Sequence, residues 1–389
     1  MEKKGTVAYV GGFEMPDRNA AAHRVKNNAR ILAALGYDVV FCGVDKTIPK
    51  DAEAPLSAWG FPSYPARYPD SAADWLRALY DFGHVRRVLD AIPNLTFVFA
   101  YNMHARPFSL LLRYSKKRGV KVIADVTEWY GNRFTVSPVG FLKWRDTERV
   151  MKRLHKKVDG MIAISRYLAD YYGPSVPRIL QLPPLVDPEE EIWHSPVSDR
   201  SEKVEFVYSG QPGRGKDQIG LIVRCFASIA PEYDFLFRVI GITEDEFCAD
   251  FPEDADRLGL LSGKIVFCGR VSHAESVLSL RRADYCVFIR EATRKNTAGF
   301  PTKFAECASS GVGVIANRIS NIEDYFPREN GYLLESTDED RICAALIAAI
   351  SAGKVEHNPS DDFDYRRHIC DFGRFLEECD GLRGPSKKQ

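Results

Sequence analysis

Residues 295–325 read KNTAGFPTKFAECASSGVGVIANRISNIEDY and predict a loop, a helix, a tight turn, a buried strand, a second loop and a short helix, in that order. Pro301 suits the first turn of a helix, because its missing N–H group would have no partner there. Gly311 suits the left-handed residue that follows a helix. The apolar run 312–316 between turn residues is typical of a strand in a parallel sheet. These residues therefore predict one αβ unit.

The start of that helix has the features of a phosphate site. Gly299, Phe300 and Thr302 would surround a helix N-terminus, whose free N–H groups and partial positive charge attract anions. Glu306 lies one turn further on, and its carboxylate can accept two hydrogen bonds from a diol such as that of ribose. Lys303 and Glu306 could instead form only a surface ion pair at i,i+3 spacing, worth about 0.2–0.5 kcal/mol.

Length and composition limit the class of protein. With 389 residues, two domains are expected, and 45% hydrophobic with 27% charged residues is typical of a soluble globular chain. The 53 basic residues are balanced by 53 acidic ones, which argues against a nucleic-acid-binding protein. The nine cysteines form no CxxC pair and are expected to be reduced thiols in the cytosol. No signal peptide and no apolar run of the ~20 residues that span a bilayer is visible.

The first half opens with a Rossmann-like pattern. A strand at 6–10 leads into Gly11-Gly12, a helix follows at 20–35, and a second strand at 38–44. Two glycines after a strand allow the backbone to approach a ligand closely, although a tight turn alone would also explain them. The motif is not GxGxxG, so a nicotinamide cofactor is only weakly indicated.

Strands and helices continue to alternate along the first half, which predicts a parallel sheet with helices on both faces. Residues 46–70 are rich in proline and predict an irregular segment with at most one short strand. Further helices are expected at 72–92, 106–117, 140–157 and 166–172, and further strands at 96–101, 120–126, 160–165 and 179–182.

Two places in this half could carry chemistry. Asp125 and Glu128 follow a predicted strand, and ligands of open α/β sheets bind beyond the carboxyl ends of strands. Their carboxylates could orient sugar hydroxyls or act as acid and base, or they could merely cap a helix or meet Arg133. The predicted helix 141–157 combines aromatic and basic residues, so it could lie on an anionic membrane surface or simply face the core with a solvated basic side.

After a proline-rich linker at 182–188 the βα alternation restarts. Strands are expected at 204–209, 235–241, 265–268 and 285–289, and helices at 219–229, 271–282 and 341–351. The loop 210–217, GQPGRGKD, has three glycines and two cations and can cradle a phosphate, or it is a solvated turn. It is not a Walker A motif, because Asp217 would put a negative charge where phosphate and Mg²⁺ should sit.

Together these features resemble a GT-B glycosyltransferase of the family 4 type. The resemblance covers most of the chain and implies an α/β fold with two Rossmann-like domains that face each other across a cleft. It implies an acceptor domain at 1–188, a nucleotide-sugar donor domain at 200–362, and a final helix and tail at 363–389 that cross back to the first domain.

The resemblance also implies roles for individual residues. Lys216 would oppose the donor diphosphate, while Gln211 stands where the family has an arginine and Arg214 could compensate. Glu306 matches the ribose-binding glutamate within a Pro-x-Lys-x-x-Glu pattern, but Ala298 replaces the family's other glutamate. The resemblance also implies that Gly11 and Gly12 lie under the donor phosphates and that Gly210 belongs to the phosphate-binding loop. Asp125 and Glu128 would lie near the transferred sugar.

The implied reaction is transfer of a sugar from a UDP- or GDP-linked donor to a glycan, lipid-linked or small-molecule acceptor, with retention at the anomeric carbon. No cofactor and no metal is expected, since the sequence shows no cluster of metal ligands. Such an enzyme of polysaccharide biosynthesis would be cytoplasmic, with possible contact to the inner face of the membrane through 141–157. A nucleotide-sugar epimerase and a non-catalytic GT-B partner protein remain open, because Ala298 and Gln211 depart from the family pattern.

Overall fold

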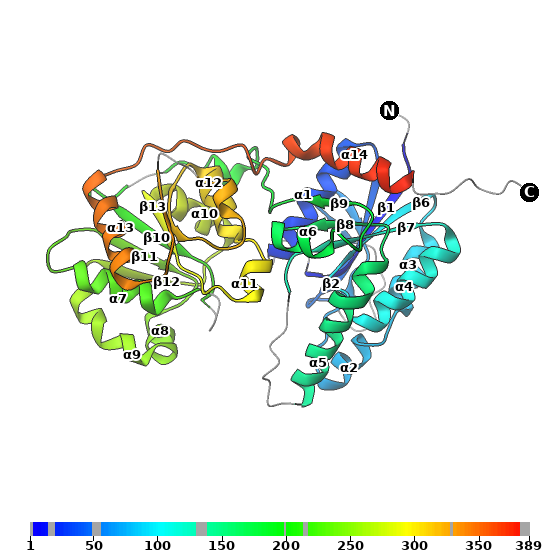
Figure 1. Cartoon of the computed structure of the whole chain (residues 1–389), viewed down its shortest axis with the longest axis horizontal. Coiled ribbons are helices and arrows are strands. Elements are labelled where there is room, and N and C mark those ends of the chain that lie inside the picture. The colour runs from blue at the N-terminus through cyan, green and yellow to red at the C-terminus, as the bar shows by residue number, and fades with distance from the viewer. Residues whose placement is uncertain are drawn as a thin grey trace, which may run out of the picture. The chain divides into compact units, whose positions relative to one another are not determined.

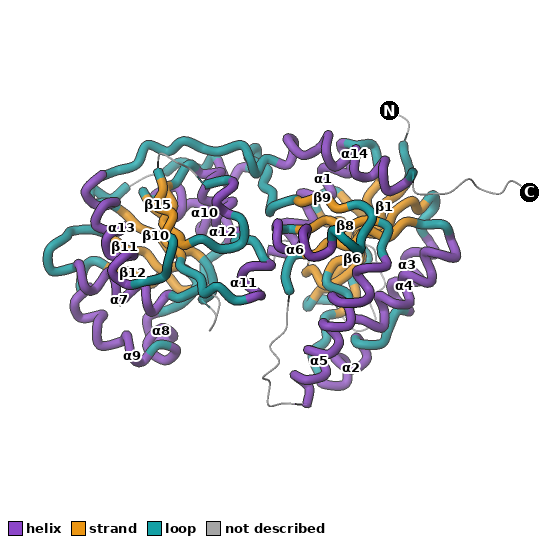
Figure 2. The backbone as a smooth tube through the Cα atoms, viewed as in Figure 1, coloured by secondary structure: helices purple, strands orange, loops and turns teal. Residues whose placement is uncertain are grey.

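The computed structural model describes residues 3–14, 20–48, 56–129, 138–197, 200–212, 217–326 and 330–381. The chain forms two compact units (Figure 1): unit 1 comprises Met1–Leu185 and Tyr365–Gln389, and unit 2 comprises Val186–Asp364. The sequence pattern places these boundaries at 188 and 363. In each unit a sheet lies between helices (Figure 2).

Unit 1 is built on a nine-stranded sheet in the order β3-β4-β2-β1-β6-β7-β8-β9, with β5 paired to β2. Only the β3–β4 pair is antiparallel among the described strands of this sheet. The strands are β1 Thr6–Glu14, β2 Asp38–Asp45, β3 Leu56–Ala58, β4 Phe61–Ser63, β5 Ala66–Arg67, β6 Leu95–Tyr101, β7 Lys121–Val126, β8 Gly160–Ala163 and β9 Ile179–Gln181. The helices are α1 Ala20–Ala34, α2 Ala72–Ala78, α3 Gly83–Ala91, α4 Ala105–Arg118, α5 Pro138–Arg149, α6 Arg166–Tyr172 and α14 Ile369–Asp380.

One face of this sheet carries the main core of unit 1. Alternate residues such as Tyr9 and Phe99 point to this face, where helix α1 packs on them. Helix α14, from the far end of the chain, packs in the same core through Phe372 and Phe375, and the Phe372 ring stacks on Phe99. The last helix therefore belongs to unit 1, as the family resemblance implies.

Unit 2 contains a six-stranded sheet in the order β12-β11-β10-β13-β14-β15. All its strand pairs are parallel in the described residues. The strands are β10 Glu205–Ser209, β11 Leu236–Ile240, β12 Ile265–Gly269, β13 Tyr285–Phe288, β14 Gly313–Asn317 and β15 Gly331–Leu334. The helices are α7 Ile219–Ile229, α8 Glu244–Asp250, α9 Pro252–Ala255, α10 His273–Arg282, α11 Arg294–Ala298, α12 Thr302–Ser310 and α13 Glu339–Ala352.

The αβ unit expected within 295–325 is present as α12 and β14. Pro301 is the N-cap of α12, one residue before the first helical position. Gly311 ends the helix with φ of 73°, and a Cβ there would lie 2.4 Å from the backbone nitrogen of Asn358, so only glycine fits. Helix α10 lies beside α12 in unit 2 (Figure 1).

Several predicted elements differ in the structure. The single helix expected at 72–92 is two helices, because the Asp81 carboxylate accepts the Gly83 N–H and competes with helical bonding. The helix expected at 140–157 is α5 followed by a π-helical turn, Val150–Leu154, and a 3₁₀ turn, His155–Lys157. The segment 46–70 contains three short strands rather than one at most, and α8, α9 and β15 have no counterpart among the predicted elements.

Candidate functional site

The strand order of unit 2 locates its candidate site. Counted in chain order the sheet is arranged 3-2-1-4-5-6, so β10 and β13 are central neighbours whose following loops leave in opposite directions. Ligands of doubly wound sheets bind at this switch point, beyond the carboxyl ends of the strands. Gly210 and Gln211 follow β10, and Arg290 follows β13. Helix α12 begins beside the same edge.

Gly210 has a conformation and a neighbour that require glycine. Its φ is +137°, and a Cβ there would lie 3.1 Å from the Lys303 Nζ. The carbonyl of Gly210 in turn approaches Gly241, where a Cβ would lie 2.3 Å from it. Gln211 is exposed, next to the loop. The glycine therefore allows a cation to lie directly against the backbone that follows β10.

Lys303, Arg290 and Asp217 form a buried charge cluster with Tyr208. The Lys303 Nζ lies 2.8 Å from Asp217 Oδ2, and the Arg290 Nε lies 2.6 Å from Asp217 Oδ1. The Tyr208 hydroxyl donates to Asp217 Oδ2 at 2.8 Å, and the Lys303 ammonium lies 3.9 Å from the Tyr208 ring centroid. All four side chains are buried.

The cluster fixes the protonation state of Asp217. Burial by itself would raise the pKa of this carboxyl, but the Lys303 and Arg290 charges hold it well below its ordinary value. Burial and the neighbouring Asp217 charge raise the pKa of Tyr208 well above its ordinary value. At neutral pH the cluster therefore holds one negative and two positive charges.

Glu306 does not pair with Lys303, so the alternative of a local i,i+3 ion pair is wrong. Its Oε1 lies 3.2 Å from Nε2 of His273, the first residue of α10. The Glu306 and His273 side chains are 16% and 25% exposed. The carboxylate thus keeps a path to solvent and a second oxygen available for a ligand.

The other residues predicted around the α12 N-terminus differ in how far they are buried. Phe300 is buried in an aromatic cluster with Phe304, Tyr325 and Phe363, so only its backbone could meet a ligand. Gly299 is buried, and Thr302, the first residue of the helix, is half-buried. Ala298, the position of the missing glutamate, is fully buried in α11.

Two predicted donor residues, Arg214 and Lys216, lie outside the described residues. Their assignment to the donor diphosphate stays a prediction. Asp217, the first described residue after them, is held by a bridge to Arg290. Its carboxylate is paired with two buried cations, Arg290 and Lys303.

In unit 1, Gly11 and Gly12 lie inside β1 and not in a loop after it. Gly11 has φ of +136°, and a Cβ there would lie 1.8 Å from the Tyr101 carbonyl oxygen on the neighbouring strand β6. Gly12 is exposed. The close approach of two strands therefore accounts for Gly11, and a contact with donor phosphates remains a prediction for both residues.

Asp125 is closed to solvent by a network of its own. Its carboxylate accepts hydrogen bonds from Arg24 Nε at 2.8 Å, Asn28 Nδ2 at 3.3 Å and the Tyr9 hydroxyl. Arg24 also donates to the carbonyl of Leu182 at 3.1 Å, which ties α1 to the segment before the unit boundary. Asp125 and Arg24 are 1% and 4% exposed. This geometry gives Asp125 a structural role, and its role in catalysis stays a prediction.

Glu128 lies two residues beyond the end of β7 and is half-buried. Thr127 next to it is buried, and its Oγ1 lies 3.2 Å from the Tyr101 hydroxyl. Glu128 is therefore the more accessible of the two predicted carboxylates, and its role also remains a prediction.

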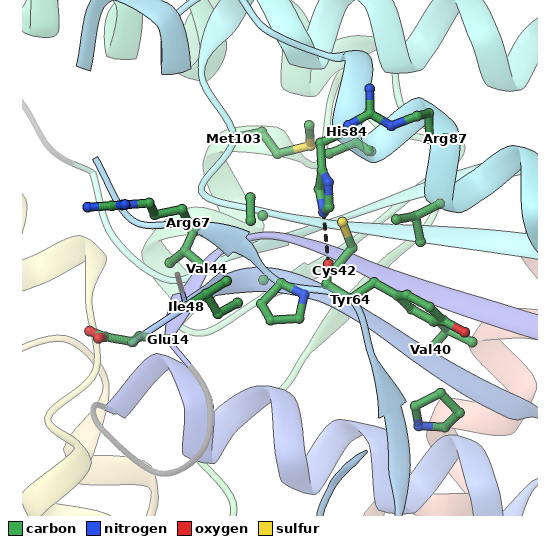
Figure 3. Close-up of a pocket in the computed structure, with 18 of the residues that line it drawn as sticks. Glu14, Val40, Cys42, Val44, Ile48, Tyr64, Arg67, His84, Arg87 and Met103 are labelled. Atoms are coloured by element: carbon green, nitrogen blue, oxygen red, sulfur yellow. Dashed lines mark hydrogen bonds between the residues drawn. The ribbon is translucent and has the colours of Figure 1, made fainter. Parts of the chain in front are cut away.

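A groove of about 2430 Å³ lies on the face of the unit 1 sheet opposite to α1. Val40, Cys42 and Val44 alternate with the core residues of β2 and line this groove. Figure 3 shows the His84 side chain pointing toward Tyr64, to whose carbonyl its Nε2 is hydrogen-bonded at 2.9 Å. Arg67 and Arg87 lie to either side in the same view. Gly12 and Glu14, near the carboxyl end of β1, also line the groove.

The sequence pattern did not identify three residues of the site: Asp217, Arg290 and His273. Asp217 was visible as an unusual residue after a Gly-Lys pair, but nothing local identified its partners. Arg290 and His273 carry no motif signal at all. Among the described residues, no group of three or more His, Cys, Asp or Glu side chains is arranged to hold a metal ion.

Comparison with known proteins gives one family match. Residues 203–352, most of unit 2, match a family model described as glycosyl transferases group 1. No curated protein sequence matches the chain.

Solved structures resemble the chain over nearly its whole length. Sucrose-phosphate synthase from Thermosynechococcus elongatus is 15% identical with a TM-score of 0.63, over 97% of this chain and 95% of that one. Anabaena HepE in complex with UDP and glucose is 13% identical with a TM-score of 0.59, over 96% and 99%. WaaG, a glycosyltransferase involved in lipopolysaccharide biosynthesis, is 13% identical with a TM-score of 0.61, over 97% and 100%. The predicted GT-B fold class is confirmed by these likenesses.

Proposed function

We propose that this chain, a GT-B glycosyltransferase whose residues 203–352 belong to the glycosyl transferases group 1 family, moves a sugar from a nucleoside diphosphate donor to an acceptor hydroxyl. The observation that carries the proposal is the arrangement at the switch point of unit 2. There the N-terminus of α12, the Lys303 ammonium and the Glu306 carboxylate occur within one turn of helix. A helix N-terminus and a cation suit phosphates, and a carboxylate suits a ribose diol.

The chemistry requires stabilisation of the departing diphosphate. As the anomeric C–O bond breaks, positive charge develops on the sugar and negative charge on the leaving group. Preorganised donors and cations aimed at that negative charge lower the barrier. We propose that Lys303 and the α12 N–H groups supply this stabilisation, together with Lys216 and Arg214. Retention at the anomeric carbon, absence of a metal and a UDP- or GDP-linked donor are part of the proposal.

The groove of unit 1 is the proposed acceptor site. Its volume of about 2430 Å³ exceeds the ~300–1,000 Å³ of typical small-molecule sites, which favours an extended acceptor such as a glycan over a single sugar. Its lining combines aliphatic side chains with the aromatic residues Phe61, Tyr64, Tyr68 and Trp75 and with paired charges such as Lys46–Glu14. The likeness to HepE, whose structure contains UDP and glucose, and to WaaG, which is involved in lipopolysaccharide biosynthesis, is compatible with a carbohydrate acceptor.

Peripheral membrane contact through 141–157 is a further part of the proposal. Phe141 and Leu142 of α5 are 49% and 47% exposed. Lys143 lies over the Trp75 ring of α2 at 4.5 Å, so these residues adjoin the exposed Leu76 of that helix. Exposed apolar side chains among cations favour an anionic interface. Among the described residues, no helix is long and apolar enough to cross a membrane.

The proposed function is tested by a thermal-shift screen against UDP, GDP and ADP, followed by turnover with the matching sugar donor. A specific stabilisation by one diphosphate, and sugar transfer only when an acceptor is present, are the expected results. Formation of an isomeric nucleotide sugar without acceptor would identify an epimerase instead. No stabilisation by any of the three would favour a non-catalytic partner protein. Sedimentation with anionic vesicles, compared between wild type and Phe141→Ser, tests the membrane contact.

A further inference from the structure

The charge cluster in unit 2 holds more positive charge than its own contacts neutralise. One carboxylate, Asp217, accepts from two cations, Lys303 and Arg290. In the part of the chain that the structure describes, neither cation contacts a second carboxylate. With Asp217 ionised, the sum is one net positive charge among side chains that are at most 8% exposed. A buried excess charge is costly unless a counter-charge approaches it.

The excess positive charge lies close to the proposed donor site, because Lys303 is in the first turn of α12 and its ammonium lies next to Gly210. Lys303 is the second residue of α12. The free N–H groups at the start of a helix point outward along its axis, toward an anion bound there. The Lys303 ammonium lies against Gly210, where a Cβ would be only 3.1 Å away, and Gly210 is half-exposed. An anion over Gly210 would therefore meet the positive cluster through backbone alone.

Arg290 differs from Lys303 in its place within the cluster. Its backbone N–H donates to Asn317 Oδ1 at 2.8 Å, and the Asn317 Nδ2 returns a bond to its carbonyl at 2.9 Å, so the residue is locked at the end of β13. Its guanidinium neutralises Asp217 from the side opposite to Lys303, since the two cations use different carboxylate oxygens. Without Arg290, Lys303 and Asp217 would form a neutral pair.

We infer that Arg290, locked by Asn317 and paired with Asp217, is a positioning residue of the donor site that keeps the Lys303 charge uncompensated and so selects donors with a diphosphate. The inference rests on the proposed function, because it assigns a specificity device to the same site. The Arg290 charge acts on the ligand through Lys303 and Asp217, without direct contact between Arg290 and the ligand. Its effect must therefore grow with the charge of the ligand.

The test is calorimetric titration of the full chain with UDP and GDP and with the matching monophosphates, over a series of salt concentrations. Arg290→Gln should weaken binding of the diphosphate by about tenfold or more, weaken the monophosphate less, and flatten the dependence of log Kd on log salt. Arg290→Lys keeps the charge and should restore most of the selectivity. Arg238→Gln is the matched control, because Arg238 forms a half-buried pair with Glu205 at 2.9 Å near the other end of the strands.

The outcomes separate the inference from the proposed function. If wild type binds none of the three diphosphates of the thermal-shift screen, the proposed function fails and the inference with it. If wild type binds one of them and folded Arg290→Gln keeps the wild-type ratio of diphosphate to monophosphate affinity, the inference alone fails. Should Arg290→Gln not fold, Asp217→Asn gives the opposite change, from one to two net charges, and must steepen the salt dependence; an unchanged slope would overturn the inference.

Discussion

Replacing Asp125 tests whether this carboxylate holds unit 1 together or acts on substrate. Its side chain has no exposed area and accepts hydrogen bonds from Arg24, Asn28 and Tyr9. Asp125→Ala leaves the Arg24 guanidinium, itself 4% exposed, without its counter-charge. Removing one partner of a buried ion pair costs about 3–5 kcal/mol, because the remaining charge stays in a low-dielectric site. We expect a loss of that size in the stability of unit 1.

The assay is urea-induced unfolding followed by tryptophan fluorescence. Four of the five tryptophans (Trp59, Trp75, Trp129 and Trp144) lie in unit 1 and one (Trp193) lies in unit 2, so the signal reports mainly on unit 1. A slope of about 1–3 kcal/mol per M converts the expected loss into a midpoint lowered by about 1 M or more.

A double-mutant cycle with Arg24→Met isolates the pair. The double variant should lose less stability than the sum of the two single variants, because removing both partners leaves no buried charge. Asp38→Asn is the control in the same unit: Asp38 pairs with Lys3 at 2.6 Å, but both side chains are largely exposed, so a change within about 1 kcal/mol is expected. A loss below about 1 kcal/mol for Asp125→Ala, together with abolished turnover, would refute the structural assignment and restore the catalytic one.

Three further predictions concern the donor site and the pH dependence of stability. Lys216→Ala should lower turnover by about 10²–10³-fold with an unchanged thermal transition, and wild-type turnover would remove the residue from the site. Glu306→Ala should weaken binding of the donor nucleotide by about tenfold or more while leaving inorganic pyrophosphate binding unchanged; calorimetry showing wild-type nucleotide affinity would contradict the ribose assignment. Burial lowers the pKa of His155 to about 3, so this group binds its proton more readily in the unfolded chain. The free energy of unfolding of unit 1 should therefore fall as the pH drops from about 6.5 toward 3, with up to about 1.4 kcal/mol per pH unit due to His155. His155→Gln should remove this contribution to the pH dependence, as measured by urea unfolding between pH 7 and 5.

Much of the fold could be predicted because its signals are local. The apolar run after Gly311 and the periodicity of 219–229 identify a strand and a helix within one or two residues of β14 and α7. Gly311 itself is explained by a left-handed φ that few other residues adopt. By contrast, the break between α2 and α3 was missed, since the Asp81 bond to Gly83 overrides a continuous helical pattern.

The sequence by itself determined the alternation of strands and helices, the start of α12 after Pro301 and the presence of Lys303 and Glu306 on it. Only the tertiary structure decided the partners of these residues. Lys303 is three positions from Glu306, yet it pairs with Asp217, 86 positions away, and Glu306 meets His273 instead. The physical reason is the strand order: it places β10 beside β13, so that residues that follow two distant strands converge at one sheet edge and form ion pairs there. No local pattern encodes which strands become neighbours.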